Sequence, residues 1–402
     1  MAATTAKQMR AWRGPAILTY GFRPFFFSAA VWAAVSMALW LPMLTGVLSV
    51  PTAFDAVSWH AHEFLFGYLG TVIAGFLLTA VPNWTGRLPI VGWRLGALAL
   101  VWLAGRVAVL FSAGLSPALV AALDLAFPLL LALAIGREIV AGKNWRNLIV
   151  LGMLGVFAMG NALYHWEAAR GDYAAQGMGL RLGVGAGILM IGVIGGRIVP
   201  SFTRNWLVKQ GSERLPVPPM RRFDKVALLL LLAALLLWVV VPMNAVTGLA
   251  MLCAGLCHAI RLSRWAGQLT FREPLLLVLH VGYSFVPLGA LALGVAILAP
   301  DVLAPAAAQH LWTGGAIGLM TLAVMTRATL GHTGQALTAG AGTMVIYLAM
   351  VLAVFARVAA GLWFDAAPLL HAISGLGWFI AFAAFVGLYG RLLLRLPAGK
   401  QS

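Results

Sequence analysis

Two histidines and a glutamate stand at the start of a long apolar segment. The order is Trp59-His60-Ala61-His62-Glu63, followed by about twenty mostly apolar residues, the length of a membrane-spanning helix. Ionisable side chains in such a segment are costly and are therefore functional more often than elsewhere. Neutral imidazole is a common ligand of transition metals and of haem iron, and it carries no charge into an apolar environment. We therefore expect this cluster to bind a metal ion or a haem.

The spacing of the two histidines predicts that they face different neighbours. Residues two positions apart on an α-helix project about 200° from each other, so His60 and His62 cannot grip one ion together as an i, i+4 pair can. One helix would then serve two centres. Glu63 follows His60 by three positions, so we expect it on the side of His60, as a ligand, an acceptor behind a ligand, or a proton carrier.

The elements that carry these residues are long apolar helices. Hydrophobic residues make up 62% of the 402 positions and charged residues only 9%, far from the balance of a water-soluble domain. The apolar runs are continuous and of spanning length, which favours helices and excludes a β-barrel. Spans are expected near residues 26–46, 60–82, 92–113, 118–136, 147–168, 179–197, 226–243, 245–262, 274–298, 304–327, 339–361 and 367–390. The sequence therefore predicts an all-α polytopic membrane protein with twelve transmembrane helices.

Charge placement predicts the orientation of these helices. With the N-terminus inside, inner segments carry 23 of the 27 Lys and Arg residues. The outer loops together carry two, and the spans together carry the other two. This asymmetry follows the positive-inside rule, so both termini are predicted to be cytoplasmic. The net charge of +16 then reflects topology and gives no support for a nucleic-acid partner. The one sizeable soluble stretch, 198–225, is rich in Pro and basic residues and is predicted to be a cytoplasmic linker.

A weak repeat divides the chain into three parts. Three predicted spans leave the membrane through similar polar sequences, which align at Thr85, Thr203 and Thr333. The aligned threonines are 118 and 130 residues apart, and each interval holds four spans. The chain is therefore predicted to be a single integral membrane domain of three four-helix pseudo-repeats. Their approximate bounds are 20–141, 147–262 and 274–395.

Two histidines occupy equivalent positions in this alignment. His62 precedes Pro82 by 20 residues and His310 precedes Leu330 by the same number, whereas the middle repeat has Leu180 there. We therefore expect His62 and His310 to serve one haem from two equivalent helices.

Most histidines of the chain map to one depth. Of the 8 histidines, those predicted at outer ends of spans are His60, His62, His165, His310 and His371. Glu63, Arg106 and Asp124 lie in or near the same layer. A single histidine in a helix is usually a hydrogen-bonded core residue, but so many at one depth, in a chain with 11 carboxylates, favour cofactor binding.

The other three histidines give weaker signals. His280 lies inside the ninth predicted span and fits either a core position or a ligand. His258 and His332 are predicted near the inner face, where solvation is expected. The stretch from Cys253 to His258 has one residue too many for the covalent haem motif C-x-x-C-H. A haem in this chain is therefore expected to be haem b, held without thioether bonds.

Five stretches of the sequence resemble the NnrS family, bacterial inner-membrane proteins tied to nitric oxide stress and denitrification. They are Gly21-Phe22-Arg23-Pro24-Phe25-Phe26, Trp59-His60-Ala61-His62-Glu63, Pro82-Asn83-Trp84-Thr85-Gly86-Arg87, Arg197-Ile198-Val199-Pro200-Ser201-Phe202-Thr203 and Met325-Thr326-Arg327-Ala328-Thr329-Leu330-Gly331-His332-Thr333. The resemblance spans residues 21–333. It implies a multi-pass protein of the bacterial inner membrane that binds haem, with copper also associated, and that protects cells from nitric oxide. Whether nitric oxide is turned over is left open.

A looser analogy is architectural. Twelve helices in three arcs, with haem histidines on the second and tenth, is the plan of the catalytic subunits of haem–copper oxidases and nitric oxide reductases. This chain departs from that plan because its His-x-His pair lies on the second span and because its sixth and seventh spans have no histidine. The three-histidine copper site of that superfamily is therefore not transferred.

Three functions remain open at this point. We favour a haem protein, with copper or another second metal, that reduces nitric oxide to nitrous oxide near the periplasmic face. The first alternative is a non-catalytic haem protein that binds or senses nitric oxide. The second is a membrane transporter, although no two spans resemble inverted broken-helix repeats around a midplane polar site.

Candidate roles follow from depth and spacing. His60 and Glu63 are the expected catalytic pair. Haem binding is expected from His62, His310, His371 and His165, and binding of a second metal from His60, His165, His371 and His280. The expected partners are nitric oxide, membrane lipid and an electron donor, for which a quinol and a cytochrome c are equally open.

Overall fold

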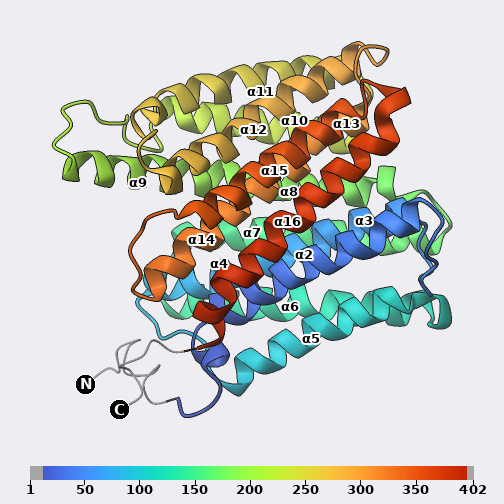
Figure 1. Ribbon diagram of the computed structural model, residues 1–402, viewed down its shortest axis with the longest axis horizontal. Coiled ribbons are helices and arrows are strands. Elements are labelled where there is room, and N and C mark those ends of the chain that lie inside the picture. Colours follow the sequence, from blue (N-terminus) through green and yellow to red (C-terminus); the bar gives the residue numbers. More distant parts are fainter. Residues whose placement is uncertain (1–11, 396–402) are drawn as a thin grey trace. The chain divides into compact units, whose positions relative to one another are not determined.

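The computed structural model describes residues 12–395, and their regular structure is entirely helical (Figure 1). The first helices are α2 (Phe22–Leu44), α3 (Ala56–His62), α4 (Gly70–Thr85), α5 (Trp93–Leu110), α6 (Pro117–Ala141), α7 (Leu148–Ala169), α8 (Met178–Met190) and α9 (Gly196–Lys209). The others are α10 (Arg222–Val240), α11 (Ala245–Ser263), α12 (Pro274–Leu298), α13 (Pro305–His310), α14 (Met320–His332), α15 (Ala341–Ala359) and α16 (Ala367–Leu394).

Three of the long helices contain a π-helical segment. The segment η2 (Glu63–Leu69) joins α3 to α4, η6 (Ile191–Gly195) joins α8 to α9, and η8 (Leu311–Leu319) joins α13 to α14. Once these segments are joined, the described chain forms twelve continuous helices. The second, sixth and tenth of them, which the threonine alignment pairs, are the three with a π-helical segment. The threefold repeat itself stays a prediction.

Eleven helices in the described part of the chain are long and apolar enough to cross a membrane. The twelfth, residues 305–332, is less apolar because it carries Gln309, His310 and Arg327. The predicted all-α, multi-pass membrane protein is therefore confirmed. The orientation of the termini stays a prediction.

Local sequence fixes both ends of the helix that carries the opening cluster. Asp55 caps α3, because its carboxylate accepts hydrogen bonds from the N–H groups of Val57 and Ser58, both at 2.9 Å. The same continuous helix ends at Gly86, whose φ of +68° is left-handed and suits glycine. These ends set the positions of the ionisable residues that lie between them.

The helix that contains α9 extends beyond its predicted membrane boundary. The sequence predicts a linker over 198–225, but the helix continues to Lys209. The end of the apolar run marks the predicted membrane boundary, whereas the helix goes on as an amphipathic one that buries Val199 and Leu207 and exposes Arg204. The connection to α10 is therefore shorter than predicted.

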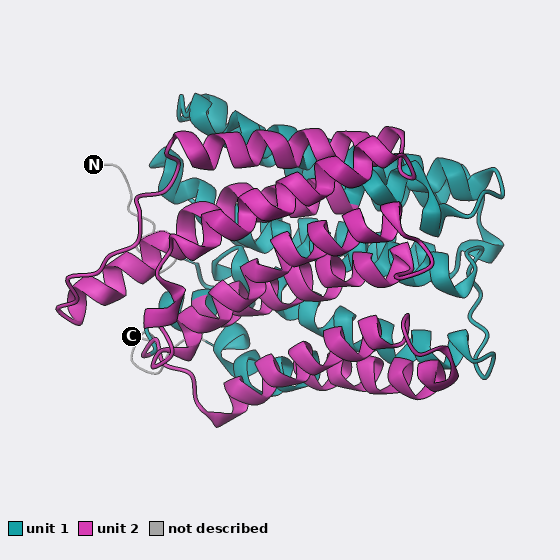
Figure 2. Cartoon of the chain, turned by 90° about the horizontal axis from the view of Figure 1, so that it is seen from above, with its two compact units in different colours: residues 1–183, 328–335, 382–402 teal, residues 184–327, 336–381 magenta. Residues whose placement is uncertain are grey.

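Two compact units divide the described residues (Figure 2). The first unit comprises 12–183, 328–335 and 382–395, and the second comprises 184–327 and 336–381. Within the first, α5 packs against α6, and α2 packs against α4. Within the second, α11 packs against both α10 and α12. The first unit holds the opening cluster.

One buried arginine ties the two ends of the first unit together. Arg23 on α2 is 2% exposed, and its Nη1 donates to the carbonyl oxygens of Leu392 and Leu393 at 3.0 Å and of Arg395 at 3.1 Å. Leu392 and Leu393 belong to the last turn of α16, where a helix leaves its carbonyls to be bonded by other groups, and Arg395 follows directly. Arg23 therefore caps that helix.

Candidate metal centre

A cluster of buried polar side chains lies where α3, η2, α5, α6 and α7 of the first unit meet. Its members are His62, Glu63, Arg106, Asp124, Asn161 and His165. Each is at most 6% exposed. Polar and charged groups at this burial are costly unless they are paired, and each member contacts another.

Glu63 accepts hydrogen bonds from several helices. Arg106 Nη1 donates to its Oε1 at 2.6 Å, His62 Nδ1 lies 2.9 Å from the same oxygen, and Trp32 Nε1 donates to Oε2 at 2.7 Å. Gly67 leaves the space for this arrangement. A Cβ at that position would lie 2.6 Å from Arg106 Nη1 and 2.9 Å from Glu63 Oε2. A glycine in η2 thus allows the carboxylate and the guanidinium to meet.

Asp124 lies at the centre of the cluster. Its Oδ1 accepts a hydrogen bond from Arg106 Nη2, and its Oδ2 accepts one from Asn161 Nδ2 at 2.7 Å. The same Oδ2 lies 2.9 Å from His165 Nε2 and 3.2 Å from His62 Nε2. The side-chain oxygen of Asn161 also lies 3.0 Å from His62 Nε2. One carboxylate therefore contacts side chains of α3, α5 and α7.

The group His62, Asp124 and His165 suits a transition metal. Its three donor atoms lie within 4.8 Å of one another, and all three side chains are buried. The contacts of Asp124 Oδ2 with His165 Nε2 at 2.9 Å and with His62 Nε2 at 3.2 Å bring the donor atoms close enough to share one ion through bonds of about 2.0–2.2 Å. Two imidazoles and one carboxylate are a set that zinc, iron and copper accept.

Charge balance in the cluster also favours a bound cation. Glu63 and Asp124 carry two negative charges, whereas Arg106 carries one positive charge. With both imidazoles neutral, one negative charge remains in an environment that solvates ions poorly. A metal ion, or a proton on one imidazole, would compensate it.

Aromatic side chains close the cluster from the side of the α2–α3 connection. The ring of Phe54 lies 5.6 Å from that of His62 and 6.0 Å from that of His165, centroid to centroid. A cavity of about 10 Å³ adjoins Arg106 and Asp124, room for about one water molecule. The cluster is therefore shielded from bulk solvent, with space beside it for about one small molecule.

His60 lies on the other side of the helix, as its spacing from His62 predicts. Its ring stacks on Trp40 with 4.0 Å between centroids and lies 4.3 Å from the ring of Phe64. The same spacing predicts Glu63 beside His60, yet Glu63 lies against His62. That prediction assumed an α-helical period, and η2 begins at Glu63, where the wider π-helical turn redirects the side chain.

The other predicted ligands belong to the second unit. His310 Nδ1 lies 2.6 Å from the carbonyl oxygen of Ala306, which accepts a hydrogen bond from it and so keeps the proton on Nδ1. His371 is half-buried and makes no hydrogen bond within residues 12–395. The side chain of His280 is buried, and its Nε2 lies 2.8 Å from Thr203 Oγ1. This hydrogen bond satisfies the nitrogen in the protein core without a metal ion.

A second buried network surrounds Arg261 in the second unit. Arg261 Nε donates to Asp224 Oδ1 at 3.0 Å, and Nη1 donates at 2.8 Å to the hydroxyl of Tyr283 and to the carbonyl of Gly192 in η6. His258 Nδ1 lies 3.0 Å from the same hydroxyl. His258 is fully buried, so the expectation that it is solvated is wrong. Depth along the helix predicts solvation, but this face of α11 packs against α10 and α12.

The ionisable layer predicted from the sequence corresponds to the cluster around Asp124, but the prediction missed one member, Asn161, and one hydrogen-bond donor to the cluster, Trp32. Asn161 precedes His165 by four positions on α7, and this spacing places both on one face. Trp32 gave no signal, because nothing in its sequence surroundings distinguishes it from the other tryptophans. His332, predicted to be solvated, is exposed.

Comparison with known proteins agrees with the sequence resemblance. The profile of the family described as NnrS protein matches residues 16–396, nearly the whole chain. No curated protein matches the chain.

Proposed function

Since the chain belongs to the NnrS family of membrane proteins, which is linked to the nitric oxide response, we propose that it reduces nitric oxide at a metal ion held by His62, Asp124 and His165. The observation that carries this proposal is the convergence of the three donor atoms within 4.8 Å in a buried site. Buried clusters of imidazole and carboxylate in a membrane protein are expensive and are functional by default.

The reaction sets the requirements for the site. Two nitric oxide molecules, two electrons and two protons give one nitrous oxide and one water. A redox-active metal ion bound there would pass electrons from the donor to nitric oxide. The electrons would come from a quinol or a cytochrome c.

Residues beside the proposed ligands have defined tasks. Glu63 Oε1 accepts a hydrogen bond from His62 Nδ1, 2.9 Å away. This bond orients the imidazole and makes its other nitrogen, Nε2, a stronger metal ligand. Arg106 donates to both carboxylates, which holds Asp124 beside the two imidazoles and Glu63 beside His62. We propose His62, Asp124 and His165 in place of the predicted catalytic pair of His60 and Glu63, because Glu63 contacts His62.

We also propose haem b as a second cofactor, held in the second unit. His310 supports this assignment because the carbonyl of Ala306 accepts a hydrogen bond from its Nδ1, a contact of the kind that orients an imidazole that binds haem iron. His371 is the other candidate. His62 fits a haem less well, since both of its ring nitrogens contact cluster members.

The proposal is tested by anaerobic turnover of the purified, reduced protein, with nitrous oxide measured by gas chromatography. Asp124→Asn and His165→Ala should lower the rate by at least about tenfold to a hundredfold, the loss that follows weakened metal binding. His332→Ala changes an exposed histidine of the same unit and should keep the wild-type rate. Wild-type rates in both cluster variants would overturn the proposal.

A second function is supported by the size of the cavity. At about 10 Å³, the space beside Arg106 and Asp124 holds one small molecule rather than two. That favours a protein that binds one nitric oxide without turning it over. In this case nitric oxide would shift the spectrum of the wild-type protein, and no nitrous oxide would form.

A further inference from the structure

A groove on the apolar surface of the first unit runs between α5 and α6, outside the metal cluster. A cavity of about 650 Å³ opens at one end of this helix pair. Its lining includes Trp12, Trp93, Arg94, Ala97, Val101, Leu130, Ala134 and Arg137. One end of the cavity is basic and aromatic, and the rest is apolar.

The basic end carries two arginines that lack a protein partner. Arg94 and Arg137 are exposed, and neither makes a hydrogen bond or an ion pair within the described residues. Glu138 also lines the cavity, but its carboxylate is already engaged, since its Oε2 accepts a hydrogen bond from Arg87 Nε at 2.5 Å. The mouth of the cavity therefore has an excess positive charge that an anion would complement.

Two tryptophans place this end at a membrane surface. The rings of Trp12 and Trp93 pack edge to face with centroids 5.7 Å apart. Trp93 is 69% exposed. Tryptophan is enriched at the level of lipid headgroups, where an apolar ring and a polar N–H are both accommodated.

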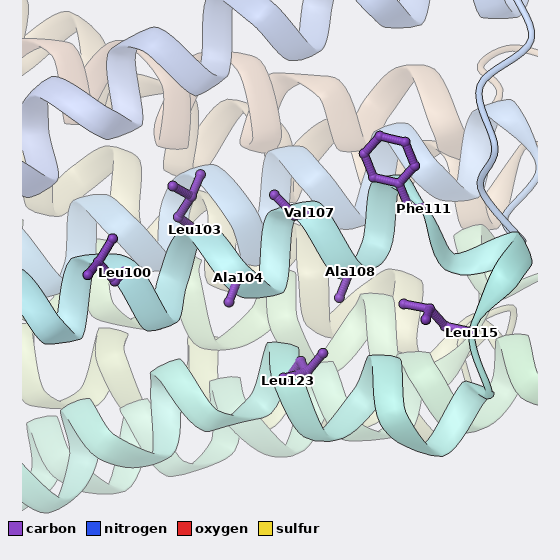
Figure 3. A pocket seen from close by; sticks show the side chains of 8 residues that line it. All are labelled: Leu100, Leu103, Ala104, Val107, Ala108, Phe111, Leu115 and Leu123. Atoms are coloured by element: carbon purple, nitrogen blue, oxygen red, sulfur yellow. The ribbon is translucent and has the colours of Figure 1, made fainter.

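The apolar part of the groove continues along the same two helices. A second cavity of about 460 Å³ lies further along α5, and in Figure 3 Ala104 points toward α6 while Leu123 points toward α5. From Arg94 to Ala104 the helix rises about 15 Å. One leaflet of a bilayer has a hydrocarbon layer of about 15 Å, half of the total. An acyl chain would thus reach this second cavity from a headgroup at Arg94.

We propose that the α5–α6 groove binds one anionic glycerophospholipid. The phosphate lies between Arg94 and Arg137, the tryptophans flank the headgroup, and an acyl chain follows Ala97, Val101 and Ala104. A lipid with a net negative charge matches the two unpaired arginines better than a zwitterionic one, whose ammonium group would meet the same charges. The helices beside the groove also supply Arg106 and Asp124, so the lipid would brace the pair that carries the metal cluster.

Native mass spectrometry of the full chain tests this assignment. The protein is titrated in neutral detergent with phosphatidylglycerol or with phosphatidylcholine of the same acyl chains, and bound lipids are counted. Each of Arg94→Gln and Arg137→Gln should weaken phosphatidylglycerol binding about fivefold, the ratio equivalent to about 1 kcal/mol per basic residue. Arg146→Gln is the matched control, because Arg146 is exposed, lacks a partner among residues 12–395 and lies outside the groove.

A second variant tests the apolar part without changing charge. Ala104→Trp fills the groove at an exposed position and should also weaken binding, whereas Leu133→Trp on the exposed face of α6 should not. Equal affinity for both lipids, retention of phosphatidylglycerol by the double arginine variant, or a dimer that buries the groove in place of lipid would each overturn the proposal.

Discussion

Replacing Arg106 by methionine should destabilise the protein strongly. Arg106 is 2% exposed and donates to the carboxylates of both Glu63 and Asp124. Methionine keeps much of the volume but leaves two buried carboxylates without their cation. Breaking a buried ion pair from one side typically costs about 3–5 kcal/mol. Because two carboxylates lose their partner here, we expect the upper part of that range.

The free energy of unfolding can be measured by titrating the purified protein from mild detergent into dodecyl sulfate and following tryptophan fluorescence. Arg146→Gln, which removes an exposed arginine without a partner among the described residues, should change it by less than about 0.5 kcal/mol. Adding Asp124→Asn to Arg106→Met removes one of the stranded charges and should recover part of the loss. A cost below about 1 kcal/mol for Arg106→Met would refute the view that Arg106 holds these charges in the buried cluster.

Acid acetone should extract the haem from the purified protein, because no thioether motif holds it; colour that stays with the polypeptide would contradict haem b. His310→Ala should remove the haem absorption while His62→Ala retains it, since both ring nitrogens of His62 contact the metal cluster. Loss of the same absorption in both variants would instead support the pairing inferred from the repeat. Arg23→Ala should speed amide exchange in the last turn of α16 about tenfold or more, because capping bonds from a charged donor contribute about 1.5–3 kcal/mol. Unchanged exchange there would show that Arg23 is not needed as a cap.

The number and type of the helices could be predicted from the sequence because the apolar runs are long and continuous. Residues 305–332 show the limit of this argument: the segment is helical, but Gln309, His310 and Arg327 lower its hydropathy. The end of α9 was misplaced for a related reason. Hydropathy reports where an apolar run ends, and an amphipathic helix can continue past that point.

The residues that form the site could largely be predicted from the sequence, but which of them contact each other could not. Depth along the helices put Glu63, Arg106 and Asp124 in the layer of the histidines, and the described structure has all three in contact with one another or with His62. The prediction of which side Glu63 faces was wrong, because a π-helical segment has no clear sequence signature. The burial of His258 depends on helix packing, which depth alone does not give.

Metal content is the most direct test of the proposed centre at His62, Asp124 and His165. The purified protein is analysed by inductively coupled plasma mass spectrometry beside His165→Ala and the exposed control His332→Ala. We expect one transition-metal ion per chain in the wild-type and His332→Ala proteins beyond any haem iron, and less than about a tenth of that in His165→Ala. Equal metal content in all three proteins, or none beyond haem iron in the wild type, would contradict a metal centre at this cluster.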